Sequence, residues 1–96
     1  MTKERDPHKA VNYIIAHAKQ FAEAKAMRVY LEEFRKSKKA LLMAQSTAEA
    51  ANTREQYAYS HPEYIELLDG LREAVEKEEK LRWDLIAAQA RVEIWR

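Results

Sequence analysis

The sequence predicts an all-α protein, folded as a long antiparallel helical hairpin with coiled-coil-like packing. Glycine occurs once and proline twice among 96 residues, which leaves few turn-forming residues and is typical of long helices. The last third of the chain repeats apolar residues at alternating spacings of three and four, and turn signals converge at one place, residues 60–62. We therefore expect a single helical domain over residues 1–96.

The first predicted helix runs from about residue 7 to about residue 59. Asp6 is suited to cap its start, and Pro7 is suited to the first helical position, where its missing N–H has no partner to lose. The stretch 44–52 is its weakest part, because hydroxyl and amide side chains stand there among small alanines. Small residues permit close helix approach, so we interpret this stretch as continuous helix in a tight contact.

The turn is predicted at residues 60–62, followed by a second helix over about 62–94. Proline disfavours helical backbone at the preceding residue, His61. Ser60, followed three residues later by Glu63, forms a capping-box pattern in which each side chain satisfies a free backbone amide. These signals place the reversal of the chain at this corner.

The second helix carries a heptad seam in which nine of ten positions are apolar. A seam of this length is the pattern of a helix that lies along another helix. The exception, Glu78, is a charged seam position, which costs stability and commonly fixes register or oligomeric state. Gly70 is the one weak interior residue, tolerated where a neighbouring helix comes close. The seam residues are Tyr64, Leu67, Leu71, Ala74, Glu78, Leu81, Leu85, Ala88, Val92 and Trp95.

A turn at this corner would place Ala88 opposite Phe34 and Leu81 opposite Leu41. The second helix would then end beside the middle of the first, leaving the apolar residues of the first helix's N-terminal part without an intrachain partner. Burying each large apolar side chain is worth ~1.5–3 kcal/mol, so we expect a homodimer, completing a helical bundle; a fold-back near residues 24–28 into a three-helix bundle is the alternative. The predicted dimer interface comprises Val11, Ile14, Ile15 and Phe21.

The net charge of +1 hides two halves of opposite sign. Residues 1–48 hold ten Lys or Arg and five acids, whereas residues 49–96 hold seven and eleven. Opposite charges favour antiparallel pairing of the halves.

Clustered cations also bind phosphates, although no aromatic residues interleave here as platforms for base stacking. The candidate nucleic-acid contacts are Lys25, Arg28, Arg35, Lys36, Lys38 and Lys39.

Aromatic residues gather around the predicted turn. Aromatic side chains at helix ends commonly pack against the fold, but they are also enriched in protein interfaces. The turn is therefore the first candidate for a partner surface, formed by Tyr57, Tyr59, His61 and Tyr64.

Composition and spacing argue against several classes of function. The chain has no cysteine, and its three histidines lack the spacing that places metal ligands on one helix face. We expect no metal site, no cofactor and no catalytic residues, because the acids of the second helix accompany no nucleophile and no glycine-rich loop. Uncharged runs are too short for a membrane span and the start is not a signal peptide, so we expect a cytoplasmic protein that does not enter membranes.

Five stretches of the two predicted helices carry a resemblance to known proteins: Tyr57–Tyr64, Leu71–Ala74, Leu81–Trp83, Ala87–Ala90 and Tyr30–Glu32 with the basic run after it. In these stretches the chain resembles a group of small helical proteins encoded by tailed bacteriophages. Members of this group are often encoded among replication or recombination genes, and some continue past the position that matches Arg96. The resemblance implies a phage origin, a setting in the host cytoplasm and a neighbourhood of DNA metabolism, and it implies no activity.

Three functions follow as hypotheses. The first is a non-enzymatic phage accessory protein that binds another protein of DNA replication or recombination, or inhibits a host factor. The second is a DNA-binding accessory protein that uses the basic run. The third is a purely structural helical adaptor.

Overall fold

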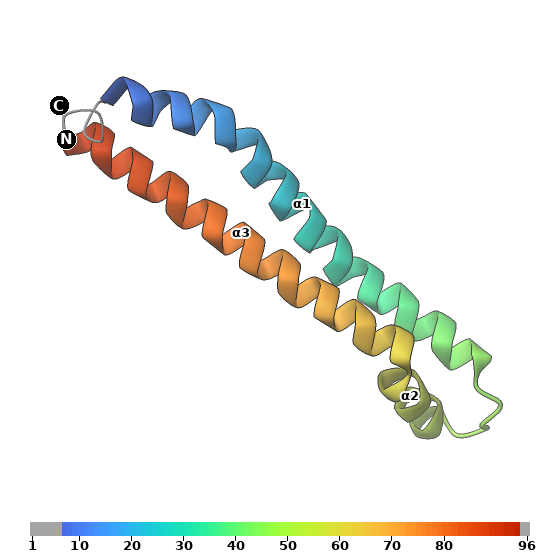
Figure 1. Ribbon diagram of the computed structural model, residues 1–96. Helices are drawn as coiled ribbons and strands as arrows, with labels where there is room; N and C mark the ends of the chain where they lie inside the picture. Colours follow the sequence, from blue (N-terminus) through green and yellow to red (C-terminus); the bar gives the residue numbers. More distant parts are fainter. Residues whose placement is uncertain (1–6, 95–96) are drawn as a thin grey trace. The chain divides into compact units, whose positions relative to one another are not determined.

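The computed structural model describes residues 7–94, and these residues form three α-helices and no strand (Figure 1). Helix α1 spans Pro7–Gln45, α2 spans Ala51–Ser60 and α3 spans Pro62–Ile94. The predicted all-α class is therefore confirmed. No helix in the described part of the chain is long and apolar enough to cross a membrane.

The chain divides into two compact units. Unit 1 comprises Met1–Ala26 and Val75–Arg96, and unit 2 comprises Met27–Ala74. Helices α1 and α3 each contribute to both units, whereas α2 belongs wholly to unit 2.

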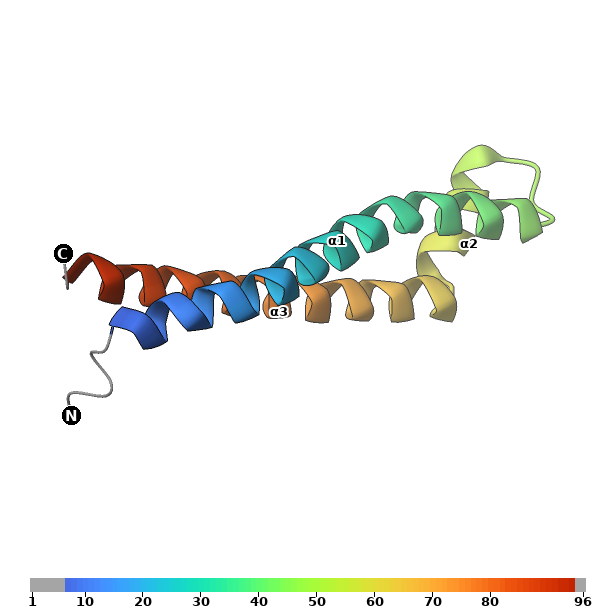
Figure 2. The ribbon, with the colours of Figure 1, turned by 90° about the horizontal axis from the view of Figure 1, so that it is seen from above.

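The prediction of one helix over residues 7–59 is wrong, because α1 ends at Gln45. The hydroxyl of Ser46 accepts a hydrogen bond from the amide of Ala48 at 3.2 Å, a local bond that competes with the helical ladder. The guanidinium of Arg54 then donates to the carbonyls of Ala48 and Glu49 at 3.1 and 2.6 Å, which holds the loop before α2 (Figure 2). The weak stretch is therefore a loop.

The corner between α2 and α3 lies where the sequence predicts it, but the capping box does not form. The Ser60 hydroxyl donates to the carbonyls of Gln56 and Tyr57 within α2. Instead, Nδ1 of His61 accepts the backbone N–H of Glu63 at 3.1 Å. The backbone of His61 is extended, with ψ at 135°, as expected before a proline. An imidazole therefore caps α3.

The predicted seam of α3 is the buried side of that helix. Each seam position from Tyr64 to Val92 is buried or half-buried, while Trp95 lies outside the described residues, as does the predicted cap Asp6. On α1 the same alternation of three and four runs through residues that the sequence does not mark as a seam. These buried or half-buried positions are Ala10, Ile14, His17, Phe21, Ala24, Arg28, Leu31, Arg35, Lys38 and Leu42.

The predicted overhang of the first helix is wrong. Residues 7–26 share unit 1 with residues 75–94, so the N-terminal part of α1 packs within its own chain. The pairing shifts because α2 and its loop take up residues that the prediction placed in a longer first helix. Leu67 rather than Ala88 lies opposite Phe34 in the groove between α1 and α3 of unit 2, and Ala88 belongs to unit 1.

The core of unit 2 joins all three of its helical segments. Leu42 of α1, Ala58 of α2 and Tyr64 of α3 form a buried cluster, with Met43 packed against it. Leu42 is completely buried. This cluster fixes the corner against the end of α1.

Candidate protein-interaction surface

Two lysines at the end of α1 tie this helix to α2 and α3. The ammonium of Lys38 donates to the carboxylate of Glu63 on α3 at 2.5 Å. Lys39 lies 3.6 Å from Glu55 on α2, and its ammonium stands 4.7 Å from the centre of the Tyr59 ring. Ion pairs and a cation–π contact therefore join segments that are far apart in the sequence.

These contacts change the protonation equilibria of the residues that make them. Its hydrogen bond with Tyr59 and the negative charge of Glu55 raise the pKa of Lys39. The hydrogen bond and the charge of Lys38 hold the pKa of Glu63 below its usual value. Both groups are therefore held in their charged forms near neutral pH.

The four predicted partner-surface residues do not share one environment. Tyr57 and Tyr59 are exposed, and the Tyr57 ring meets His61 edge to face with ring centres 5.6 Å apart. Tyr64 is only 6% exposed and belongs to the core, where its ring meets Tyr59. Tyr64 is therefore unavailable as a contact residue, and the exposed part of this surface consists of Tyr57 and Tyr59 beside the half-buried His61.

The basic run of α1 is largely neutralised within the chain. Arg28 pairs with Glu32 and Lys36 with Glu33, in addition to the pairs of Lys38 and Lys39 described above. Arg35 is half-buried at a seam position, and Lys25 belongs to unit 1 rather than to the rest of the run. The six candidate nucleic-acid contacts therefore do not form one set of free cations.

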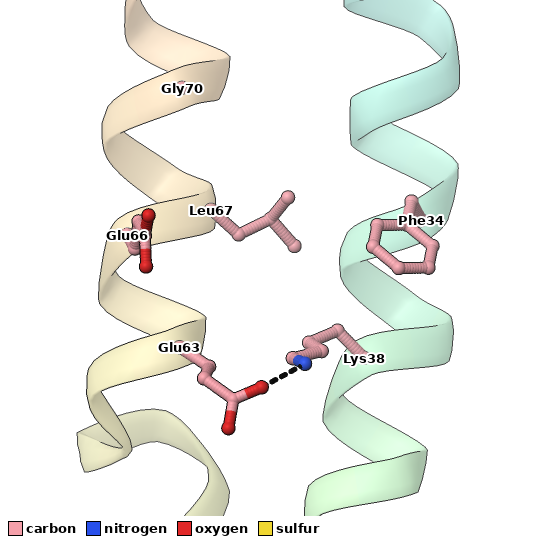
Figure 3. A pocket seen from close by; sticks show the side chains of 6 residues that line it. All are labelled: Phe34, Lys38, Glu63, Glu66, Leu67 and Gly70. Carbon is pink, nitrogen blue, oxygen red and sulfur yellow. Dashed lines mark hydrogen bonds and ion pairs between the residues drawn. The ribbon is translucent and has the colours of Figure 1, made fainter.

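A groove of about 270 Å³ opens between α1 and α3 of unit 2 (Figure 3). Phe34 of α1 and Leu67 of α3 lie on its two sides, with the ion pair of Lys38 and Glu63 at one end. The remaining lining residues are Glu66 and Gly70 of α3. Its volume lies just below the range of small-molecule pockets, ~300–1,000 Å³, and suits a few side chains of a macromolecule.

Gly70 has no packing reason within the chain. A Cβ atom built on it would meet nothing within 4 Å, and its φ is not positive. The neighbouring helix that the sequence predicts close to Gly70 is therefore not found among residues 7–94 of this chain. Glycine inside a helix is less favourable than alanine by about 1 kcal/mol, so the position costs stability and leaves the backbone open beside the groove.

The predicted dimer residues separate into two sets. Ile14 and Phe21 are half-buried at seam positions of unit 1. Val11 and Ile15 are 41% and 70% exposed. Together with the exposed Ala18 and Ala22, they form a stripe with spacings of four, three and four along α1. Two of the four residues therefore remain available for self-association.

Unit 1 contains a polar cluster that the sequence analysis did not identify. The Tyr13 and His17 rings stack with centres 3.9 Å apart, and Nδ1 of His17 donates to the Tyr13 carbonyl at 2.8 Å. Lys80 donates to Asp84 at 2.7 Å. This bond, assisted by a hydrogen bond from Tyr13 and the proximity of His17, holds the pKa of Asp84 below its usual value. His17 is on α1 and the carboxylate near it, Asp84, is on α3. The spacing of residues within one helix therefore could not predict this cluster.

Glu78, the predicted register residue, is only 3% exposed in the seam of α3. Its burial agrees with the position that the heptad assigns to it. Among the described residues, no three histidine, aspartate or glutamate side chains gather in a way that could hold a metal ion.

Comparisons with protein-family models, curated proteins and solved structures found no match to this chain. The function is therefore argued from the surfaces described above.

Proposed function

We propose that this chain is a non-enzymatic protein that acts through protein–protein contacts and associates with itself as a homodimer, completing a helical bundle. One observation carries the proposal. Among the described residues, four of the six buried apolar residues are alanines, whereas fourteen larger apolar side chains are exposed. Large apolar side chains are thus available on the surface for contact.

The exposed apolar residues are ordered along the helices. On α1 the stripe of Val11, Ile15, Ala18 and Ala22 recurs at helical spacing. On α3 Ile65 and Leu68 recur in the same way, and they are 48% and 38% exposed. Scattered apolar residues are normal on a protein surface, but contiguous ones mark contact sites.

Self-association is tested by the solution mass of the Val11→Asp, Ile15→Asp double variant, measured by light scattering. We expect the wild type at twice 11.3 kDa and the double variant as a helical monomer, because both side chains are exposed in the single chain. The matched control is Asn12→Asp, Gln20→Asp, which adds the same two negative charges to exposed positions of the same part of α1 outside the stripe. A double variant that stays dimeric excludes this stripe as the interface.

The resemblance to bacteriophage proteins supplies the setting of the proposal. We place the contacts in DNA replication or recombination within the host cytoplasm, where the partner is another protein of that process or an inhibited host factor. A purely structural adaptor would use the same surfaces.

Direct DNA binding is the less favoured alternative, because Arg28, Lys36, Lys38 and Lys39 have acidic partners in the chain. A DNA titration at low and high salt separates the two, since phosphate contacts weaken steeply as salt rises.

A further inference from the structure

The groove of unit 2 combines an apolar lining with an open helix backbone. Phe34 and Leu67 supply apolar walls, and Gly70, three residues after Leu67 on α3, also lines the groove and has nothing near its missing side chain (Figure 3). A helix accepts the cost of an interior glycine where another backbone approaches closely. No segment among residues 7–94 does so, which points to an occupant from outside.

Two carboxylates on α3 lie beside this groove or line it. Glu66 and Glu73 lie one heptad apart on α3, on either side of Gly70 in the sequence, and both are exposed. Neither forms an ion pair among the described residues, whereas the lysines on the facing helix, Lys36, Lys38 and Lys39, are paired with other acids. Of the charged residues that line the groove, Lys38 and Glu63 pair with each other, so the charge that the lining offers a partner is the carboxylate of Glu66.

An apolar stripe on α1 extends the groove into a longer surface. Met27, Tyr30, Phe34 and Leu41 recur at helical spacing, and Tyr30 stacks on Phe34 with ring centres 5.8 Å apart. Met27, Tyr30 and Leu41 are each more than half exposed. A surface of this kind, between two helices, matches the helix-in-groove mode of recognition, in which anchors recur every three or four residues.

We propose that this groove docks a basic amphipathic helix of another protein. One apolar side chain of that helix lies beside Gly70 and contacts Phe34 and Leu67, and its lysine or arginine residues meet Glu66 and Glu73. A second copy of this chain fits less well, because symmetric pairing of this face would bring the same unpaired carboxylates together. The inference rests on the proposed protein-binding function and names the class of partner.

The test uses two synthetic peptides of about 18 residues, long enough to hold a helix. Both carry leucines at positions i, i+3, i+4 and i+7, and they differ in having lysine or glutamate beside the leucines. Titrated into the isotope-labelled full chain, the lysine peptide should bind at least tenfold more tightly than the glutamate peptide. It should shift the amide resonances of Leu67 and Gly70, and its affinity should fall as salt rises.

Three variants locate the site. Gly70→Leu fills the groove with a residue that favours helix, and it should weaken binding of the lysine peptide at least tenfold without loss of folding. Glu66→Gln, Glu73→Gln should weaken it several-fold and remove the salt dependence. Glu49→Gln, which neutralises an exposed carboxylate in the loop before α2, is the matched control and should leave the affinity unchanged.

The opposing outcomes are distinct. Equal binding of both peptides, or full binding by Gly70→Leu, overturns the assignment of the groove. A change of solution mass in Gly70→Leu makes a second copy the occupant and also overturns it. Equal binding of the two peptides, or full binding by Gly70→Leu, leaves the proposed self-association intact, because that rests on Val11 and Ile15 and is measured separately. A change of solution mass would instead place self-association at the groove.

Discussion

Leu42 is the residue on which the packing of unit 2 depends most. It is the one large side chain among the described residues that is completely buried, and it touches segments of α2 and α3 through Ala58 and Tyr64. Removing its side chain would leave a cavity at the point where three helical segments meet. Its neighbour Leu41 is 58% exposed and lacks this role.

Leu42→Ala should therefore lower the free energy of unfolding by about 2–5 kcal/mol, the range for large-to-small changes in a core. Leu41→Ala, the same change one residue earlier, should cost far less, because its side chain already faces solvent. Denaturant titration followed by circular dichroism measures both. Equal losses in the two variants would contradict the placement of Leu42 in the core.

Two carboxylates predict an acid-sensitive fold. Lysine contacts lower the folded-state pKa of Glu63 below 4.5 and that of Asp84 below 3.8, their ordinary values. Because the folded pKa is the lower one, the stabilisation is fully present above these ordinary values and is lost as pH falls through the folded-state values.

Melting temperature should accordingly fall as pH is lowered from about 5 to about 2. The Glu63→Gln, Asp84→Asn variant should melt lower than the wild type near neutral pH and show a shallower dependence below pH 5. Glu49→Gln is again the control. If the melting temperature of the variant fell with pH as steeply as that of the wild type, other carboxylates would be responsible for the acid sensitivity.

At the scale of elements, the seam of α3 could be predicted and that of α1 could not. On α3 the heptad positions are apolar except at Glu78, so the pattern identifies the buried side directly. On α1 His17, Arg28, Arg35 and Lys38 stand at seam positions. A search for apolar stripes therefore found Val11 and Ile15, which are exposed. The groove could not be predicted either, because it depends on the pairing of Phe34 with Leu67.

The end of α1 illustrates a second limit of prediction. Ser46 ends the helix through one hydroxyl bond to a nearby amide, a signal much weaker than the proline at the next corner. Helix α2 then begins at Ala51, and the residue at its N-cap, Ala50, makes no side-chain capping bond. The start of α2 therefore lacks a side-chain cap, which a substitution at Ala50 could supply.

Ala50→Asp should raise the free energy of unfolding by ~0.5–2 kcal/mol, because aspartate can accept a free amide at the start of α2 and favours the positive end of the helix dipole. Thermal denaturation measures the gain. Ala50→Val, which cannot cap, should give none. A gain of equal size from valine would mean that the effect does not come from capping.

At the scale of the whole molecule, many large apolar side chains remain exposed outside the core. The apolar stripe of α1 in unit 1 suits self-association, while the acidic groove of unit 2 suits a partner of opposite charge. Because these features belong to different units, variants at Val11 and Ile15 and variants at Gly70 should act independently. The two proposed roles can therefore be removed one at a time.

The alanine-lined interior also has a consequence for how this sequence can vary. Ala10, Ala24 and Ala88 are each at most 5% exposed, so larger residues there would push the helices apart. At exposed positions such as Ile15 and Met27, the packing of the single chain does not restrict the size of the side chain. Substitution by polar residues at these positions is selected against only while a binding partner covers them. Among diverging copies of this gene, persistent apolar residues at exposed positions would thus record which contacts are still in use.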